Sequence, residues 1–176
     1  MNRVTRLAFP LLLLATTSVP HARAAGSGTA NVTLAASAHA MIQIVDPALV
    51  LTPTPADYDA DLIEATGVSG LRVQVKTNSS TGLALLIRCA DASPQIALAD
   101  LLVRTQTASP SGGPTQASYT PITGSDQTLW TVGVAQHPWL TVTTDVRIQN
   151  LINYNDASSA GTTNYTNTLT YSVVVQ

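Results

Sequence analysis

The feature that most constrains the fold of this chain is an alternation of apolar and polar residues with a period of two. Successive side chains of a β-strand point to opposite faces of its sheet, so this period predicts half-buried strands. It is clearest in residues 71–77, where Leu and Val alternate with Arg, Gln and Lys, and in residues 83–90, where four apolar residues ending at Cys89 share one face. No segment has a convincing helical period; residues 96–102 come nearest and are too short.

The same period predicts several further strands. They are residues 30–45, 101–105, 129–135, 141–148 and 165–175. The polar cluster at residues 78–82 is typical of a turn, so residues 71–77 and 83–90 are predicted to form a hairpin. Pro138 predicts a break before residue 141. About eight short strands separated by turns favour an all-β fold, a single antiparallel two-sheet sandwich of immunoglobulin-like kind, with a closed barrel as the alternative.

The N-terminus has the three parts of a secretory signal. Arg3 and Arg6 precede an apolar run at residues 7–15, and the small-residue stretch that follows contains Ala22 and Ala24. The run is too short to cross a bilayer, which takes about 20 residues, and the alanines match an A-x-A cleavage site. We therefore expect residues 1–25 to be removed and residues 26–176 to form one exported domain in the periplasm, at the cell surface or outside the cell. No later stretch predicts a transmembrane segment.

Charge argues against a nucleic-acid partner. Only 10% of residues are charged, with eight basic and ten acidic side chains, against about 25% charged in ordinary soluble domains. Arg3, Arg6 and Arg23 leave with the signal, so five basic residues face ten acidic ones and the mature net charge is −5. Nucleic-acid binding needs a basic surface.

The sequence offers few groups for catalysis. His39 and His137 are far apart in the mature chain, and Cys89 is the single cysteine. Because Cys89 shares its face with apolar residues, we expect a buried, reduced thiol; an intermolecular disulfide is the alternative. There is no Gly-x-Ser-x-Gly motif of a serine hydrolase. The sequence therefore predicts no enzyme, no catalytic residue and no cofactor.

One acidic segment has the ingredients of a cation site. Its carboxylates are Asp57, Asp59, Asp61 and Glu64. Alternating carboxylates in a loop can coordinate Ca²⁺, but an EF-hand needs Gly at the sixth position and Glu at the twelfth. Here these positions hold Leu62 and Val68. We interpret the segment as a solvated loop without a metal, with a calcium site as the alternative.

The two tryptophans receive different predictions. Trp130 follows Leu129 within a predicted strand and is expected in the core, whereas Trp139 follows Pro138 in a predicted loop. Trp139 is therefore the candidate for a binding contact.

Three features carry a family resemblance. A signal peptide leads into an alternating strand at residues 32–44; a hydrophobic strand follows a small polar turn at residues 83–89; and the chain closes with Gly161, Tyr165 and alternating Thr and Val. In these respects the mature chain resembles small secreted bacterial β-sandwich proteins of the pilin and spore-coat-protein-U kind. The resemblance implies a structural subunit of a surface fibre or coat.

Two functions follow as predictions. The first is an exported, non-enzymatic structural or interaction protein of the bacterial cell surface, pilin-like, coat-like or adhesive. The alternative is a secreted glycan- or protein-binding module that uses Trp139.

The length of one predicted strand bears on how the first function would operate. Residues 30–44 exceed the usual five or six residues and contain neither Lys nor Pro. We expect the segment to pair entirely within its own domain, and the other reading is that its first part adds to the open sheet edge of another copy or another surface subunit. Pairing within the domain would need a bend at Ala35-Ala36, and deletion of residues 26–34 distinguishes the two readings.

Overall fold

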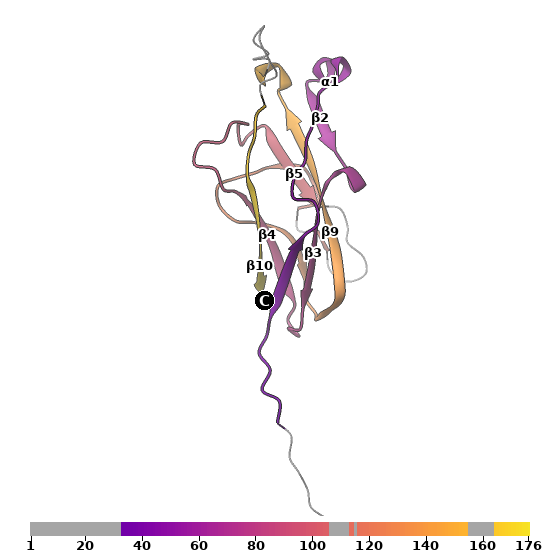
Figure 1. The fold of residues 1–176 in the computed structure, drawn as a ribbon, viewed down its shortest axis with the longest axis vertical. Helices are drawn as coiled ribbons and strands as arrows, with labels where there is room; N and C mark the ends of the chain where they lie inside the picture. The colour runs from indigo at the N-terminus through magenta and orange to yellow at the C-terminus, as the bar shows by residue number, and fades with distance from the viewer. Residues whose placement is uncertain (1–32, 106–112, 115, 155–163) are drawn as a thin grey trace, which may run out of the picture. The chain divides into compact units, whose positions relative to one another are not determined.

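The computed structural model describes residues 33–105, 113–114, 116–154 and 164–176, and the elements below all belong to the compact unit Ala36–Gln176 (Figure 1). Strands account for 46% and helices for 10% of the structure. The strands form two antiparallel sheets, which confirms the predicted all-β sandwich over the single closed sheet that was the alternative. The predicted signal, residues 1–25, lies outside the described residues.

The first sheet has six strands. Along its main path the order is β1 (Ala40–Ile44), β3 (Leu71–Thr77), β9 (Gln136–Gln149), β5 (Leu101–Thr105) and β7 (Thr120–Pro121), and β2 (Leu62–Ala65) also pairs with β9. The second sheet has the order β10 (Leu169–Val175), β4 (Leu83–Cys89), β8 (Gln127–Val132) and β6 (Gly113–Pro114). Three short helical turns complete the described elements: α1 (Pro55–Ala60), η1 (Gly67–Ser69) and η2 (Leu151–Tyr154). None of these described helices is long and apolar enough to cross a membrane.

The core lies between the inward faces of the two sheets. Its largest fully buried side chains include Trp130, Leu83, Leu85, Ile87, Leu129, Val73, Val75 and Val142. The predicted core position of Trp130 and the predicted burial of Cys89 are both confirmed. Cys89 is buried on the same face of β4 as Leu85 and Ile87, as the period of two requires.

The predicted hairpin of β3 and β4 is wrong, although both strands are where the sequence placed them. β3 pairs with β1 and β9, whereas β4 pairs with β10 and β8, so the chain crosses from one sheet to the other between them. Two features accompany the crossing: the Asn78 side chain holds residues 37–39 beside β3, and the backbone turns at Gly82, which has a φ of 86°. The two apolar faces therefore meet across the core.

The predicted break at Pro138 is also wrong. β9 begins at Gln136 and continues through Pro138 to Gln149. Opposite the proline, the register with β3 shifts between Val75 and Thr77. Such a bulge interrupts the ladder of hydrogen bonds, and proline is tolerated there because its missing N–H is not needed.

Four segments differ from their predicted structure at one end or throughout. The strand predicted at residues 129–135 is β8, which begins at Gln127 and ends at Val132. Within residues 33–45 the only strand is β1, and residues 33–39 are exposed and lie outside any strand. The last strand begins at Leu169 and not at residue 165. The acidic segment, predicted as a loop, begins with helix α1, because Pro55 at its first turn and the capping contacts of Thr54 and Asp57 favour a helix start.

Candidate functional site

The carboxylates of Asp57, Asp61 and Glu64 in the acidic segment each form hydrogen bonds with different partners. Asp57 accepts hydrogen bonds from the Thr54 N–H and hydroxyl, each at 2.7 Å, and these bonds lower the pKa of Asp57. Asp61 ends α1 and accepts the Ile152 N–H at 3.2 Å. Among the described residues, no group of three or more His, Cys, Asp or Glu side chains is placed to hold a metal ion.

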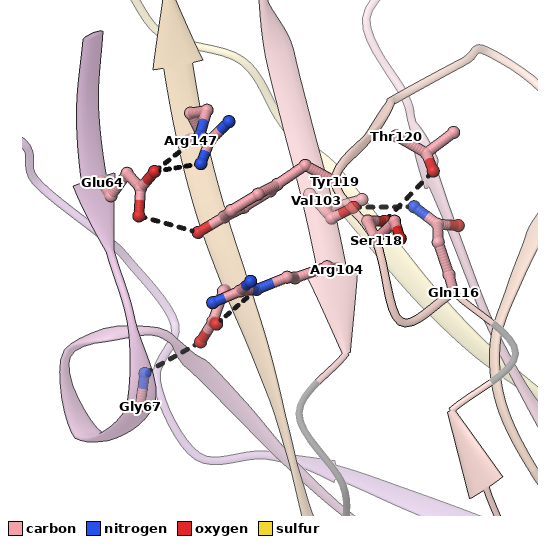
Figure 2. Close-up of polar contacts among 10 residues, drawn as sticks. Glu64, Gly67, Val103, Arg104, Gln116, Ser118, Tyr119, Thr120 and Arg147 are labelled. Carbon is pink, nitrogen blue, oxygen red and sulfur yellow. Dashed lines mark hydrogen bonds and ion pairs between the residues drawn. The ribbon is translucent and has the colours of Figure 1, made fainter. Parts of the chain in front are cut away.

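Glu64, the last carboxylate of the acidic segment, belongs to a cluster on the outer face of the six-stranded sheet (Figure 2). We call it the Tyr119 cluster; it consists of Glu64, Arg104, Tyr119, Asp145 and Arg147. The Tyr119 ring lies between the two arginines, with guanidinium carbons 4.4 Å (Arg104) and 3.9 Å (Arg147) from its centroid. Its hydroxyl donates to Glu64 at 3.2 Å, and Arg147 Nε donates to Glu64 at 2.6 Å.

Asp145 is the anchor of the cluster. Its side chain is 0% exposed although it points away from the core, because η1 and Arg104 cover it. It accepts a hydrogen bond from Arg104 Nε at 2.9 Å and another from the Gly67 N–H at 2.8 Å (Figure 2). The Asp145 carboxylate of β9 therefore holds two elements: η1 through Gly67, and β5 through the Arg104 side chain.

The ion pairs and hydrogen bonds of the Tyr119 cluster join β2, β5 and η1 to β9. Burial, and after it the nearby charge of Glu64, raise the pKa of Tyr119 to about 12, so its phenol stays neutral at ordinary pH. Both arginines are paired with carboxylates.

We expect the Asp145→Ala variant to lose about 2–3 kcal/mol of unfolding free energy, since it removes two charge-assisted bonds and leaves Arg104 partly buried without its carboxylate. Chemical denaturation measures this loss. Asp59→Ala is the control, because Asp59 is exposed, and it should change stability by less than about 0.5 kcal/mol. Equal effects of the two variants would contradict the anchoring role.

Three tyrosines should ionise late, because burial raises the pKa of Tyr119, Tyr154 and Tyr171. The pKa of Tyr171, like that of Tyr119, is raised to about 12 from a usual value of 10.0. The folded state therefore holds these protons more tightly than the unfolded state, so this stability is complete below pH 10 and is lost as the pH rises towards 12. Tyrosinate absorbance should show that at least three of the five tyrosines ionise late in the native protein, two of them only near pH 12. Ionisation of all five near pH 10 without unfolding would contradict the burial.

Trp139, the binding candidate from the sequence, lies at a pocket on the same sheet. We call it the Lys76 pocket; its lining residues are His39, Met41, Lys76, Thr77, Asn78 and His137. Trp139 is half-buried, and the Lys76 ammonium lies 4.4 Å from the centre of its ring. Strand register explains the grouping, since Met41 pairs with Lys76 and Gln136 pairs with Thr77.

The structure thus joins residues that sequence reasoning kept apart. His39 and His137 line one pocket although they are distant in the chain. The Tyr119 cluster was missed, because its members come from β2, β5, β9 and the segment before β7. The sequence feature that could have indicated this cluster is the presence of two arginines, Arg104 and Arg147, at outward positions of predicted strands.

No family model, curated protein or solved structure matches this chain. The resemblance to pilin and spore-coat-protein-U domains therefore stays a prediction, and function is inferred from the residues themselves.

Proposed function

We propose that residues 26–176 form an exported, non-enzymatic structural or interaction subunit of the bacterial cell surface, which associates with other subunits through strand addition. The observation that carries this proposal is the pair of edge strands β1 and β10. Each ends the order of its sheet, and residues of the two strands contact one another (Figure 1).

Neither edge strand has the usual protection against pairing. Natural edge strands are commonly blocked by Lys, by Pro or by an inward charge. β1 has the sequence AMIQI and β10 has LTYSVVV, so neither contains a charged residue or a proline. Backbone groups along these edges are suited to accept a strand from another chain.

A segment suited to be donated precedes β1. Residues 33–35 are exposed and lie outside any strand, and Leu34 leaves 86% of its surface exposed. An apolar side chain in an extended segment gains stability when it enters the edge of another sandwich. This supports association through residues before Ala36, where the compact unit begins.

The proposal is tested by charging one edge. Val174 lies on β10 and is 51% exposed, so Val174→Lys places a positive charge on the edge with little effect on the core. We expect the molar mass of residues 26–176 in light scattering to fall towards that of a monomer. Val134→Lys is the matched control, because Val134 is 49% exposed and lies between β8 and β9. Equal masses for the two variants would count against edge pairing.

One observation favours the second function, a glycan- or protein-binding module. Trp139 contacts Lys76, which lines a pocket on the outer face of the sheet. Aromatic rings beside polar groups supply apolar contact area together with orientation. Loss of a glycan-array signal in Trp139→Ala would support this function.

A further inference from the structure

We propose that the Lys76 pocket binds a carboxylate-bearing saccharide, an inference that rests on the second function above. Lys76 supplies the cation, and Trp139 and Met41 supply apolar surface beside it. Among the described residues, Lys76 differs from the arginines in what its positive charge contacts.

Every arginine that the structure describes has a carboxylate partner. Arg72 pairs with Asp46 at 2.7 Å, Arg104 with Asp145 at 2.9 Å and Arg88 with Asp126 at 3.7 Å. Arg147 pairs with Glu64. Lys76 differs from all of them, because its ammonium group contacts the Trp139 ring and no described carboxylate.

The surroundings of Lys76 have the chemistry of an anion site. None of the lining residues of the pocket is acidic, and they include two histidines, His39 and His137, together with the lysine. The Asn78 amide is already engaged, since it donates to the Ser37 carbonyl at 3.0 Å and accepts the His39 N–H at 2.6 Å. Lys76, His39 and His137 are therefore the nitrogen groups left for a ligand oxygen.

The apolar groups of the site favour a sugar acid over a small inorganic anion. The Trp139 ring is half-buried next to the cation, and Met41 is exposed on the neighbouring strand directly opposite Lys76. A phosphate or sulfate ion uses only the nitrogen groups. A sugar acid also presents the apolar face of its ring, which gains from contact with an aromatic side chain.

The negative net charge of residues 26–176 means that binding of an acidic saccharide could not arise from a general electrostatic attraction between the protein and polyanions. With five basic and ten acidic residues in positions 26–176, the protein as a whole repels anions at long range. Recognition of a carboxylate then depends on the local contact with Lys76. Variants that remove or keep the positive charge at this position measure that contact.

The test titrates residues 26–176 with trigalacturonic acid, with a neutral galactose trisaccharide and with sodium phosphate or sulfate, using calorimetry. We expect the acidic trisaccharide to bind at least about tenfold more tightly than the neutral one, because a charge-assisted hydrogen bond to Lys76 is present only with the carboxylate. Lys76→Gln should remove this preference, and Lys76→Arg should keep most of it. Arg88→Gln is the matched control, since it removes one positive charge from the other sheet and should leave binding unchanged.

The outcomes separate this inference from the function on which it rests. Equal binding of acidic and neutral trisaccharides by the native chain, lost in Trp139→Ala, would overturn the inference and leave the glycan-binding function standing. Binding of neither trisaccharide would overturn the inference and count against glycan binding, and it would leave only the protein-binding form of the second function. Phosphate or sulfate binding as tightly as the sugar acid would show a site for free anions and would also overturn the inference. Because the comparison of ligands uses the unmodified chain, it decides the question even if a Lys76 variant fails to fold.

Discussion

A chain that lacks residues 26–34 is expected to stay folded and to lose self-association completely. The compact unit begins at Ala36, and its first tether is Asn78, whose amide donates to the Ser37 carbonyl at 3.0 Å and accepts the His39 N–H at 2.6 Å. The deletion ends before this tether. It should therefore change the free energy of unfolding by less than about 0.5 kcal/mol, as surface changes usually do.

Light scattering and thermal unfolding of the two chains measure the two halves of this expectation. Residues 26–176 should form species heavier than a monomer, and residues 35–176 should be monomeric with a nearly unchanged melting temperature. Unfolding or aggregation of the shorter chain would mean that residues 26–34 belong to their own sandwich. Undiminished association of a folded shorter chain would mean that another surface makes the contact.

The Gly82→Ala variant is expected to lose about 3 kcal/mol or more of unfolding free energy. Gly82 has a φ of 86°, and a Cβ at this position would lie 1.7 Å from the Val132 carbonyl oxygen and 2.5 Å from its carbon. These are backbone atoms of β8, so they cannot move aside as a flexible side chain does. The left-handed conformation alone costs a residue with a side chain about 1–2 kcal/mol, and forced overpacking typically adds about 1–3 kcal/mol.

Alanine variants of two other glycines distinguish the conformational cost of a positive φ from the steric cost of the added Cβ. Gly67 has a φ of 58°, but a Cβ there meets nothing within 4 Å, so Gly67→Ala should show the conformational cost alone, about 1–2 kcal/mol. Gly133 has open space and no positive φ, so Gly133→Ala should be close to neutral. Chemical denaturation of the three variants should give this order. A Gly82→Ala loss no larger than that of Gly67→Ala would show that the approach to β8 is looser than the structure has it.

The sequence predicted the faces of the strands better than their partners. In β4, the alternation correctly placed Leu85, Ile87 and Cys89 in the core, because side-chain direction within a strand is a local property. The hairpin between β3 and β4 was wrong, because pairing depends on where the connecting residues lead the chain. Here residues 78–82 lead it into the other sheet.

For the candidate site residues too, the sequence indicated single residues but not their partners in space. Trp139 was found from the sequence because a Trp beside a Pro stands out, but its contact with Lys76 depends on the register of β9 against β3, which shifts at Thr77. Glu64 was assigned to a possible calcium loop because its neighbours in the sequence are acidic. In space its partners are Arg147 and Tyr119, from 83 and 55 residues along the chain.

The most direct test of strand addition is to supply the segment separately. A synthetic peptide of residues 26–34 is titrated into the chain of residues 35–176, and hydrogen exchange of the backbone amides is followed with a scrambled peptide as control. Strand addition predicts saturable one-to-one binding, with slowed exchange in β1 or β10 and no effect of the scrambled peptide. Unchanged exchange at both edge strands with peptide in excess, or equal protection by the scrambled peptide, would contradict the proposal that this segment joins one subunit to the next.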